Sequence, residues 1–468
     1  MAREPRDAVS IMAPQKGAYL FPHMRRLATV LVVLGLCVGC SKTSPSSGTT
    51  IKVAYWGGPE EIAIIQHLVA DWQQQHPDVH VRLEHTPFSA YVSRLLTRMA
   101  GNVAPDIMAV EVNLFPTLWA KGAFLSLQPF IDRDPAFHIN EFFPEVVGRF
   151  SVNKDVYAIP RDTAPFACVY YNKKLFDDAK IPYPTDDWTW DDLLRISKQL
   201  TQVENGRVSR YGFYAWAWQN IVYSNGGKLV DNLYHPTKCL LGEPKAVEGL
   251  QFYSDLMNKY KVAPTPVMLG NLAMGAQQLF MTQRVAMFSS GYWEVPILRQ
   301  IKDFEWDVVM FPKGPGGKRA FGTGGTGYAI LKSTKHPDLA WDVLKALAGD
   351  DGQVRLAQTG LAQPANKVVA EGPAFALGPL PPANKAMLNQ AVKYAVYEPF
   401  IPEWREISEL NILPELDLVF NGQRTAKEAA EAFVPKVNTL LAEREKNQKS
   451  ASLIHDALPS AEAATQSE

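Results

Sequence analysis

The sequence has little cysteine, no surplus of charge of either sign and no familiar catalytic motif. Only four of its 468 residues are cysteine, which excludes a small scaffold held together by disulfides. Lys and Arg number 47 against 48 Asp and Glu, and nucleic-acid-binding chains usually show a basic surplus. His-Glu-x-x-His and Gly-x-Ser-x-Gly are absent, and the nine histidines form no ligand set. We therefore predict no metal, no cofactor and no nucleic acid, and a binding function rather than catalysis.

Aromatic residues are plentiful. The chain holds 11 Trp, 17 Tyr and 22 Phe, within an ordinary globular composition of 47% apolar and 20% charged residues. The length indicates two or three domains. Part of the aromatic content fills a core of that size, so the question is which aromatic side chains remain for a ligand.

The N-terminus has the features of an export signal. An apolar run of 13 residues, Leu27 to Gly39, is shorter than the roughly 20 residues that a spanning helix needs. Arg25 and Arg26 precede it, and Gly39 is followed by Cys40 and a polar Ser/Thr/Pro/Gly stretch. This arrangement resembles a bacterial lipobox, in which Cys40 is the lipidated first residue of the exported chain. We expect a leader and signal over 1–39 and a tether over 40–50.

Two features of this leader leave alternatives open. The Leu that usually stands three places before the lipidated cysteine is replaced by Cys37, so cleavage without lipid attachment stays possible. Residues 1–23 do not fit a signal peptide, whereas a chain that starts at Met24 has a normal one. Met24 is therefore the favoured start and Met1 the alternative.

The next hundred residues alternate strand and helix patterns. Strand character over 51–56 leads to a Pro59 helix with apolar residues at helical spacing, and Val79, Val81 and Leu83 alternate with polar residues. A helix over 89–100 and a short apolar strand at 104–110 follow. This β-α-β-α-β order predicts a parallel sheet with helices on its faces.

Similar elements follow along the rest of the chain. Helices are expected at 190–200, 244–260 and 338–348, and strands at 166–171, 285–289, 304–311 and 327–331. Thr425 and Glu428 form a capping-box pattern that predicts the start of a last helix. Gly322 to Gly327 matches the letters of a dinucleotide-binding loop, but a strand rather than a helix follows it, which argues against a nucleotide site.

Several stretches in order give the chain a family resemblance. It is similar to extracellular solute-binding proteins of the sugar-binding group (family 1, maltodextrin-binding-like), the lipoprotein receptors of ABC-type importers. The stretches are Ile51–Gly58, Ala104–Met108, Gly122–Leu127, Tyr157–Thr163, Val169–Phe176, Trp188–Leu193, Asn225–Leu229, Arg284–Trp293 and Gly324–Ile330. The resemblance covers about residues 50 to 445.

The resemblance implies an α/β fold with two lobes, the class II periplasmic-binding-protein fold. Each lobe is expected to hold a mixed, mainly parallel sheet flanked by helices, and the lobes are joined by hinge crossings. One lobe should hold 50–161 plus 305–358 and the other 162–304 plus 359–450, with a flexible tail over 451–468. The crossings are expected near Arg161–Pro165, Phe304–Asp307 and Thr359–Pro364.

The resemblance also implies a function and partners. The chain is expected to capture a mono- or oligosaccharide between its lobes and deliver it to membrane permease subunits, as a monomer on the extracytoplasmic face of a bacterial membrane. A non-sugar solute, such as a glycerol phosphate ester or a polyamine, is the alternative within this role. A secreted carbohydrate-active enzyme is less favoured, although a pair of catalytic carboxylates is not excluded by sequence.

Candidate ligand residues follow from sugar chemistry and from the resemblance. Aromatic rings cover the C–H face of a sugar, and carboxylates, amides and backbone N–H groups pair with its hydroxyls. Trp216 and Trp218 lie two apart, so on an extended segment both would face one side. The full set is Trp293, Trp216, Trp218, Trp404, Glu111, Asp162, Thr163, Gly324, Gly325, Thr326, Gln363 and Glu60. The sequence does not say whether Cys168 and Cys239 pair.

Overall fold

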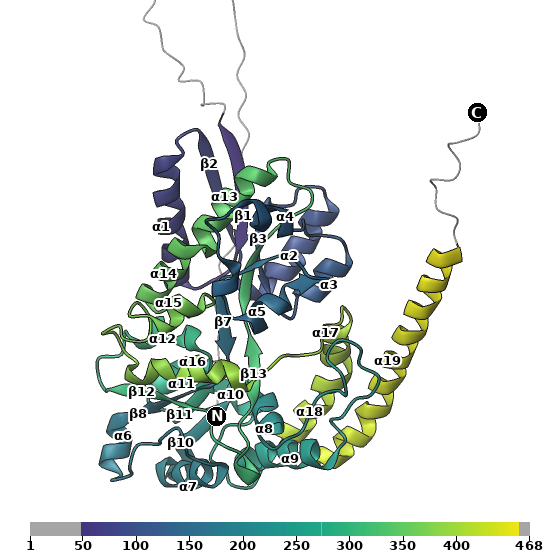
Figure 1. Ribbon diagram of the computed structural model, residues 1–468. Helices are drawn as coiled ribbons and strands as arrows, with labels where there is room; N and C mark the ends of the chain where they lie inside the picture. The colour runs from purple at the N-terminus through teal and green to yellow at the C-terminus, as the bar shows by residue number, and fades with distance from the viewer. Residues whose placement is uncertain (1–47, 273, 458–468) are drawn as a thin grey trace, which may run out of the picture. The chain divides into compact units, whose positions relative to one another are not determined.

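The computed structural model describes residues 48–272 and 274–457. The expected leader, Cys40 and most of the expected tether lie outside these residues. The described part holds three sheets of four or five strands and a small hairpin (Figure 1). No helix within these ranges is both long and apolar enough to cross a membrane.

The first sheet has the strand order β2-β1-β3-β14-β6. Its strands are β1 Thr49–Tyr55, β2 Val79–His85, β3 Ile107–Glu111, β6 Ile159–Pro160 and β14 Thr326–Ile330. The pairs β1–β2 and β1–β3 are parallel, as the β-α-β-α-β pattern predicts, whereas β14 runs antiparallel to β3 and β6. Strand β1 begins at Thr49, so the sheet starts inside the range expected for the tether.

Alternate residues of the central strands face opposite helical layers. Ile51 and Val53 of β1 and Ile107 of β3 belong to one buried cluster, and their neighbours Ala54 and Met108 belong to the other. The first cluster packs against α1 Pro59–Gln75, α4 Gln128–Arg133 and α13 Pro337–Ala348. The second packs against α2 Phe88–Ala100, α3 Phe115–Ala120 and α5 Pro144–Arg149. A strand that is apolar on both faces is therefore buried on both.

The second sheet has the order β12-β8-β11-β10-β9. Its strands are β8 Cys168–Asn172, β9 Gln202–Glu204, β10 Arg207–Ala215, β11 Val285–Ser290 and β12 Trp306–Met310. Only β10–β11 is parallel; the other three ladders are antiparallel, so this sheet is mixed but not mainly parallel. Strand β8 pairs on both sides with antiparallel neighbours, β11 and β12, that come more than 100 residues later in the chain.

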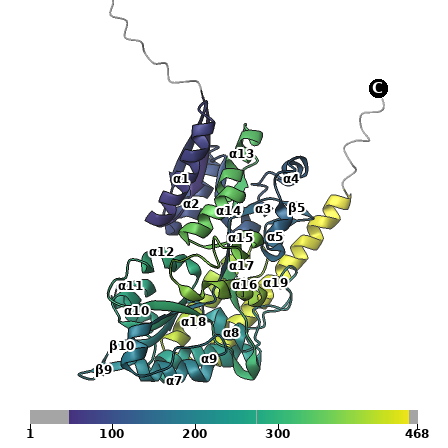
Figure 2. The same ribbon diagram turned by 60° about the vertical axis from the view of Figure 1, so that its left-hand side comes forward.

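A single large core surrounds the second sheet. Its helices are α6 Lys173–Asp178, α7 Trp190–Leu200, α8 Trp218–Ser224, α9 Pro244–Asn258, α10 Pro266–Leu272, α11 Ala276–Met281, α12 Val295–Leu298, α17 Trp404–Ile407, α18 Leu413–Phe420 and α19 Ala426–Ala457. Figures 1 and 2 place α7, α8 and α9 along the side of this sheet remote from α1 and α13. Cys168 and Cys239 are both buried here as free thiols.

The sequence predicts the start of the last helix correctly but not its end. Thr425 Oγ1 accepts from Glu428 N, and Glu428 Oε2 accepts from Thr425 N, so the predicted capping box is confirmed. The helix then continues through Ala457, into the range 451–468 that we expected to be a flexible tail.

Short strands form a middle sheet with the order β15-β7-β13-β16. They are β7 Asp162–Pro165, β13 Phe321–Gly324, β15 Gln363–Pro364 and β16 Ala395–Val396. Strand β7 connects β6 of the first sheet to β8 of the second, and β13 leads into β14. The crossings expected at 161–165 and 359–364 coincide with β7 and β15.

The crossing expected near Phe304–Asp307 is wrong. Strand β12, Trp306–Met310, pairs with β8 along its whole length and so belongs to the second sheet. The chain returns to the first sheet only where β13 passes into β14, at residues 321–326. Residues 305 to about 320 therefore move from the first lobe to the second, since a strand lies in the sheet that takes its backbone hydrogen bonds.

The remaining elements are short connections. They are β4 Ser151–Val152, β5 Asp155–Val156, η1 Ile139–Glu141, η2 Tyr292–Glu294, η3 Pro315–Gly317, α14 Asp350–Thr359, α15 Lys367–Glu371, η4 Ala383–Met387, α16 Leu388–Ala391, η5 Val392–Tyr394 and η6 Ser408–Ile412. Gln353 of α14 links β6, α13 and the residue before α15. Its buried Nε2 donates to the carbonyls of Pro160, Arg161 and Ala348, and its Oε1 accepts from Asn366 N.

Replacement of Gln353 tests how far this one amide supports the crossings. Gln353→Met keeps the volume but removes four hydrogen bonds, three to carbonyls and one from an N–H. We expect the free energy of unfolding, measured by urea denaturation, to fall by about 2–4 kcal/mol. Gln358→Met, an exposed position on the same helix, should change it by less than about 0.5 kcal/mol. Equal effects of the two changes would contradict this role.

Candidate functional site

Three aromatic rings meet where the middle sheet joins the second sheet. We call Phe166, Trp216 and Trp293 the aromatic triad; they follow β7, β10 and β11. The ring centroids of Phe166 lie 4.8 Å from Trp216 and 5.8 Å from Trp293, and the two tryptophans are 6.3 Å apart. Trp216 is 40% exposed and Trp293 39% exposed, although most aromatic side chains of this lobe are buried. The triad therefore presents ring surface to solvent.

Glycine and asparagine hold these rings in place. A Cβ at Gly291 would lie 1.8 Å from Cζ3 of Trp293, and one at Gly322 would lie 2.8 Å from Cδ2 of Phe166, so each ring rests against bare backbone. The buried Asn220 donates to the Phe166 carbonyl and accepts from the Gly322 N–H. These contacts hold the turn that contains Phe166 against strand β13.

The indole N–H groups of the triad point to one polar group. Trp216 Nε1 donates to Ser290 Oγ at 3.3 Å, and Trp293 Nε1 donates to Glu294 Oε1 at 3.1 Å. Ser290 Oγ in turn donates to the same Glu294 oxygen at 2.9 Å. Burial raises the pKa of Glu294, and the two hydrogen bonds oppose that rise. With their N–H groups engaged, both tryptophans leave their ring faces for a ligand.

Glu111 lies at the carboxyl end of β3, opposite the triad across Gly324. A Cβ at Gly324 would lie 3.6 Å from both Glu111 Oε1 and Phe166 Cε1, so the carboxylate and the ring face the same glycine. Glu111 Oε2 accepts from Asn113 N at 2.9 Å. Burial raises the pKa of Glu111 from its usual 4.5 to about 8, with a smaller contribution from Glu398. A proton on this carboxyl at neutral pH makes it a hydrogen-bond donor.

A buried arginine lies on the far side of Glu111. Arg149 Nη2 donates to the Glu398 carbonyl at 2.9 Å, and its guanidinium lies 4.8 Å and 4.7 Å from the ring centroids of Tyr397 and Phe400. The Glu398 side chain accepts from Gln219 Nε2 at 3.3 Å. Within the described residues, Arg149 Nε and Tyr223 Oη are buried without a hydrogen-bond partner. We call Arg149, Tyr223 and Glu398 the Arg149 group.

The structure brings four of the predicted site residues together. Trp216, Trp293, Glu111 and Gly324 surround one location between the ends of β3, β10 and β11. Gly325 has φ = +149°, a conformation that side chains disfavour, and its carbonyl accepts from Val112 N at 3.0 Å. Its backbone thus continues the link between β3 and β14.

Four other predicted residues are buried in the middle sheet and its neighbour β14, and they pair with one another. Asp162 Oδ1 accepts from Thr326 N at 3.0 Å, and Thr163 Oγ1 lies 3.5 Å from Gln363 Oε1. Gln363 Nε2 also donates to Asn389. Asp162 forms an ion pair with Arg161, which also pairs with Glu61. These polar groups serve the crossings, and a ligand would have to displace existing bonds to reach them.

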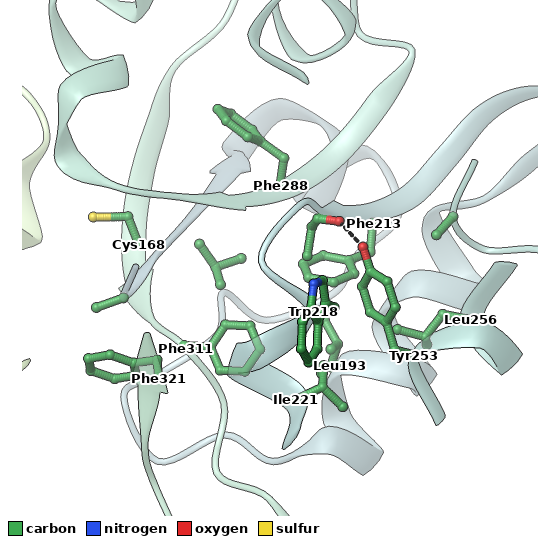
Figure 3. Close-up of a cluster of buried hydrophobic side chains, with 14 of the residues drawn as sticks. Cys168, Leu193, Phe213, Trp218, Ile221, Tyr253, Leu256, Phe288, Phe311 and Phe321 are labelled. Carbon is green, nitrogen blue, oxygen red and sulfur yellow. Dashed lines mark hydrogen bonds between the residues drawn. The ribbon is translucent and has the colours of Figure 1, made fainter. Parts of the chain in front are cut away.

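The expectation that Trp216 and Trp218 share one face is wrong. Strand β10 ends at Ala215, and Trp218 begins helix α8, so the two are not on one extended segment. Trp218 is 6% exposed and lies in the core beside Leu193, Phe213 and Tyr253 (Figure 3). Trp404 is likewise buried, at 3% exposed, in the same core. Neither ring has a free face for a sugar.

Glu60 occupies a different place from the other candidates. It stands in the first turn of α1 and accepts from Gln300 Nε2, just beyond α12 of the second lobe, at 2.9 Å. It therefore links the two lobes directly. Cys40 lies outside the described residues.

Sequence reasoning missed Phe166, Ser290, Glu294, Arg149, Tyr223 and Glu398. Ser290 and Glu294 flank Trp293 closely, so the Ser-Gly-Tyr-Trp-Glu stretch could have indicated them. Phe166 lies within an apolar strand-like run, and Glu398 follows β16 far along the chain; no local pattern connects either to Glu111. A surface depression of about 870 Å³ lies elsewhere, between α1, α13 and α14, and contains none of the candidates. No group of three or more His, Cys, Asp or Glu in the described ranges is placed to hold a metal.

Comparisons with known proteins identify the family of the chain. The family model of bacterial extracellular solute-binding proteins matches residues 57–354. An arabinooligosaccharide-binding protein of Halalkalibacterium halodurans is 26% identical over 315 residues, which are 64% of this chain and 67% of that protein. A protein of the same description from Bacillus subtilis is 24% identical over 69% of this chain and 76% of its own.

Solved structures share the fold. An ABC substrate-binding protein of Listeria monocytogenes, in complex with cycloalternan, superposes with a TM-score of 0.77 at 24% identity, covering 84% of this chain and 99% of that one. A maltose-bound MalE3 of T. maritima gives a TM-score of 0.73 at 23% identity, covering 84% and 100%. The two-lobe periplasmic-binding-protein fold expected from the sequence is confirmed.

The raised pKa of Glu111 predicts a pH-dependent stability. The folded chain keeps this proton up to about pH 8, whereas the unfolded chain loses it near its usual 4.5, so the free energy of unfolding falls as pH rises through that window. Glu111→Gln should melt at a higher temperature than the wild type at about pH 9 and show a flatter profile from about pH 5 upward, by calorimetry. The exposed control Glu305→Gln should follow the wild type. Identical profiles for Glu111→Gln and the wild type would contradict this assignment.

Proposed function

Because the chain belongs to the bacterial extracellular solute-binding proteins, a family of receptors rather than enzymes, we propose that it captures a carbohydrate for an ABC-type importer. The observation that carries this proposal is the aromatic triad, with two half-exposed tryptophans whose N–H groups are already engaged. Flat ring faces beside carboxylates match a sugar, which has a C–H face and a rim of hydroxyls. The arabinooligosaccharide-binding relatives support the same class of ligand.

We propose specific roles for the site residues. Trp216 and Trp293 stack on the ring of the sugar, and Phe166 supports both from below. Glu111 pairs with a hydroxyl from the first lobe, and the Gly324 backbone leaves the space between Glu111 and Phe166 open. Trp404 and Trp218 shape the lobe from its core. Asp162, Thr163, Gly325, Thr326 and Gln363 hold the crossings, so they affect binding through lobe position.

Closure of the two lobes about the middle sheet completes the site in this proposal. The crossings consist of strands of two to four residues, so a few backbone dihedrals can change the angle between lobes. In this proposal the first lobe holds 50–161 plus 326–358, the second holds 166–320 plus 365–450 without β16, and the middle sheet joins them. The Glu60–Gln300 hydrogen bond joins the two lobes, so a change in the angle between them acts directly on this contact. The receptor acts as a monomer and passes its ligand to permease subunits.

A phosphate ester is a less suitable ligand. Such a ligand requires a cluster of free arginines, whereas Arg161 is paired with two carboxylates and Arg149 lies between aromatic rings. The other ionisable groups near the triad, Glu111 and Glu294, are carboxyl groups rather than basic side chains.

Removal of a stacking ring tests the site. Trp216→Ala and Trp293→Ala should each weaken binding of the best sugar, found by a thermal-shift screen of mono- and oligosaccharides, by about tenfold in calorimetry, because each loses one ring contact. Wild-type protein at about 100 times the dissociation constant should gain about 2.7 kcal/mol of stability. Tyr183→Ala removes a ring of similar exposure on the same lobe and should leave the affinity unchanged. A screen in which no sugar alters the melting temperature would contradict the proposed function.

Lipid attachment at Cys40 can be tested separately. When the full chain is expressed in a bacterial host with labelled palmitate, we expect the wild type to incorporate label and to fractionate with membranes. Cys40→Ala should lose both properties, because a protein without its acyl chains has no anchor. Label that persists in Cys40→Ala would contradict the assignment, and Cys37→Ala is the matched control.

A further inference from the structure

The proposed site has more carboxyl groups than basic side chains. Glu111, Glu294 and Glu398 have no cationic side chain within 4.0 Å in the described ranges, although other buried carboxylates, such as Asp162, do. Each of the three lies at the site: Glu294 binds the Trp293 indole, Glu111 faces Phe166 across Gly324, and Glu398 interacts electrostatically with Glu111. Unpaired carboxylates in such surroundings are costly unless something neutralises them.

Arg149 forms no ion pair with these carboxyl groups, although its charge acts to lower the pKa of Glu398 and Glu111. Its guanidinium lies against the rings of Tyr397 and Phe400 and donates to a backbone carbonyl rather than to a carboxylate. Glu398 raises the pKa of Glu111 more than Arg149 lowers it, so Glu111 senses negative charge on balance. Glu294 is on the other side of the triad, where, among the described residues, its hydrogen bonds come from Ser290 and Trp293.

Two buried donors remain without an acceptor. Tyr223 Oη and Arg149 Nε belong to side chains more than nine-tenths buried, and neither makes a hydrogen bond within the described residues. Tyr223 interacts electrostatically with Glu398 and Arg149, which places its hydroxyl in the same group. Buried polar atoms are nearly always paired, so orphaned donors beside a ligand site indicate an acceptor that arrives with the ligand, such as a sugar oxygen.

The aromatic triad completes a pattern typical of amine recognition. A cation is attracted to the face of a Trp or Phe ring, and here three such rings converge between two carboxylates. We propose that the ligand is a carbohydrate that bears a basic nitrogen, with its ammonium group between Glu111 and the triad and its hydroxyl oxygens on Tyr223 and Arg149. This inference rests on the proposed function and specifies the class of sugar.

Matched sugars separate the two proposals. Calorimetry at about pH 7 compares glucosamine oligosaccharides with their N-acetylated and hydroxyl counterparts of the same linkage and length. We expect the amine form to bind at least about tenfold more tightly than either neutral form. It should also release protons, seen as a dependence of the heat on the ionisation enthalpy of the buffer, because Glu111 deprotonates when the ammonium arrives.

A change at Glu111 tests whether this carboxyl group causes the preference for the amine form. Glu111→Gln should reduce the ratio between the affinities for the amine and neutral forms to nearly one and abolish proton release. Because Glu111 also pairs with a sugar hydroxyl, the absolute affinity for both forms can fall in this variant, and the ratio is the readout. The exposed control Glu305→Gln should keep the full preference. A wild type that binds neutral forms as tightly as the amine form overturns this inference and leaves the proposed function standing. If no sugar of either set binds, or if spermidine binds and no sugar does, the proposed function itself fails.

Discussion

The buried guanidinium of Arg161 is the interaction on which the arrangement of the lobes depends. It pairs with Glu61 of the first helix and with Asp162, which begins the first crossing strand. The second oxygen of Asp162 accepts from Thr326 N, where the chain enters β14. One cation therefore ties together the start of α1, the outgoing crossing and the returning one. Loss of one partner of such a network leaves an uncompensated buried charge, which generally costs about 3–5 kcal/mol.

The position of the candidate site follows from these crossings. Phe166 comes directly after β7, and Gly322 and Gly324 belong to β13, so the same strands that join the lobes deliver a ring and a bare backbone to the site. The ends of β10 and β11 add the two tryptophans, and the end of β3 adds Glu111. Rigid strands thus fix each group, while the middle sheet sets the distance between the two sides.

Much of this arrangement could be predicted from sequence, and the failures have physical causes. Apolar periodicity places β1, α1 and β2, since alternation and helical spacing are local properties. It also places Glu111 at a strand end, whereas Trp293 is expected from the family resemblance. Periodicity does not distinguish Trp216 from Trp218, because the helix that buries Trp218 begins after Trp216. It also does not show to which sheet β12 belongs. Phe166, Arg149 and Glu398 meet Glu111 through packing of segments some 40 to 290 residues apart, which no local pattern records.

The place of β14 has a consequence for how the chain reaches its folded state. This strand lies between β3 and β6 in the first sheet. Strands β3 (107–111) and β6 (159–160) are therefore not joined until β14 (326–330) has been synthesised. A ribosome makes the chain from its N-terminus, and a domain folds as a unit only once its parts are present. The N-terminal half therefore emerges as an incomplete sheet with an open edge for most of its synthesis. Until β14 is made, that edge presents unpaired N–H and C=O groups, which are a template for pairing with another chain.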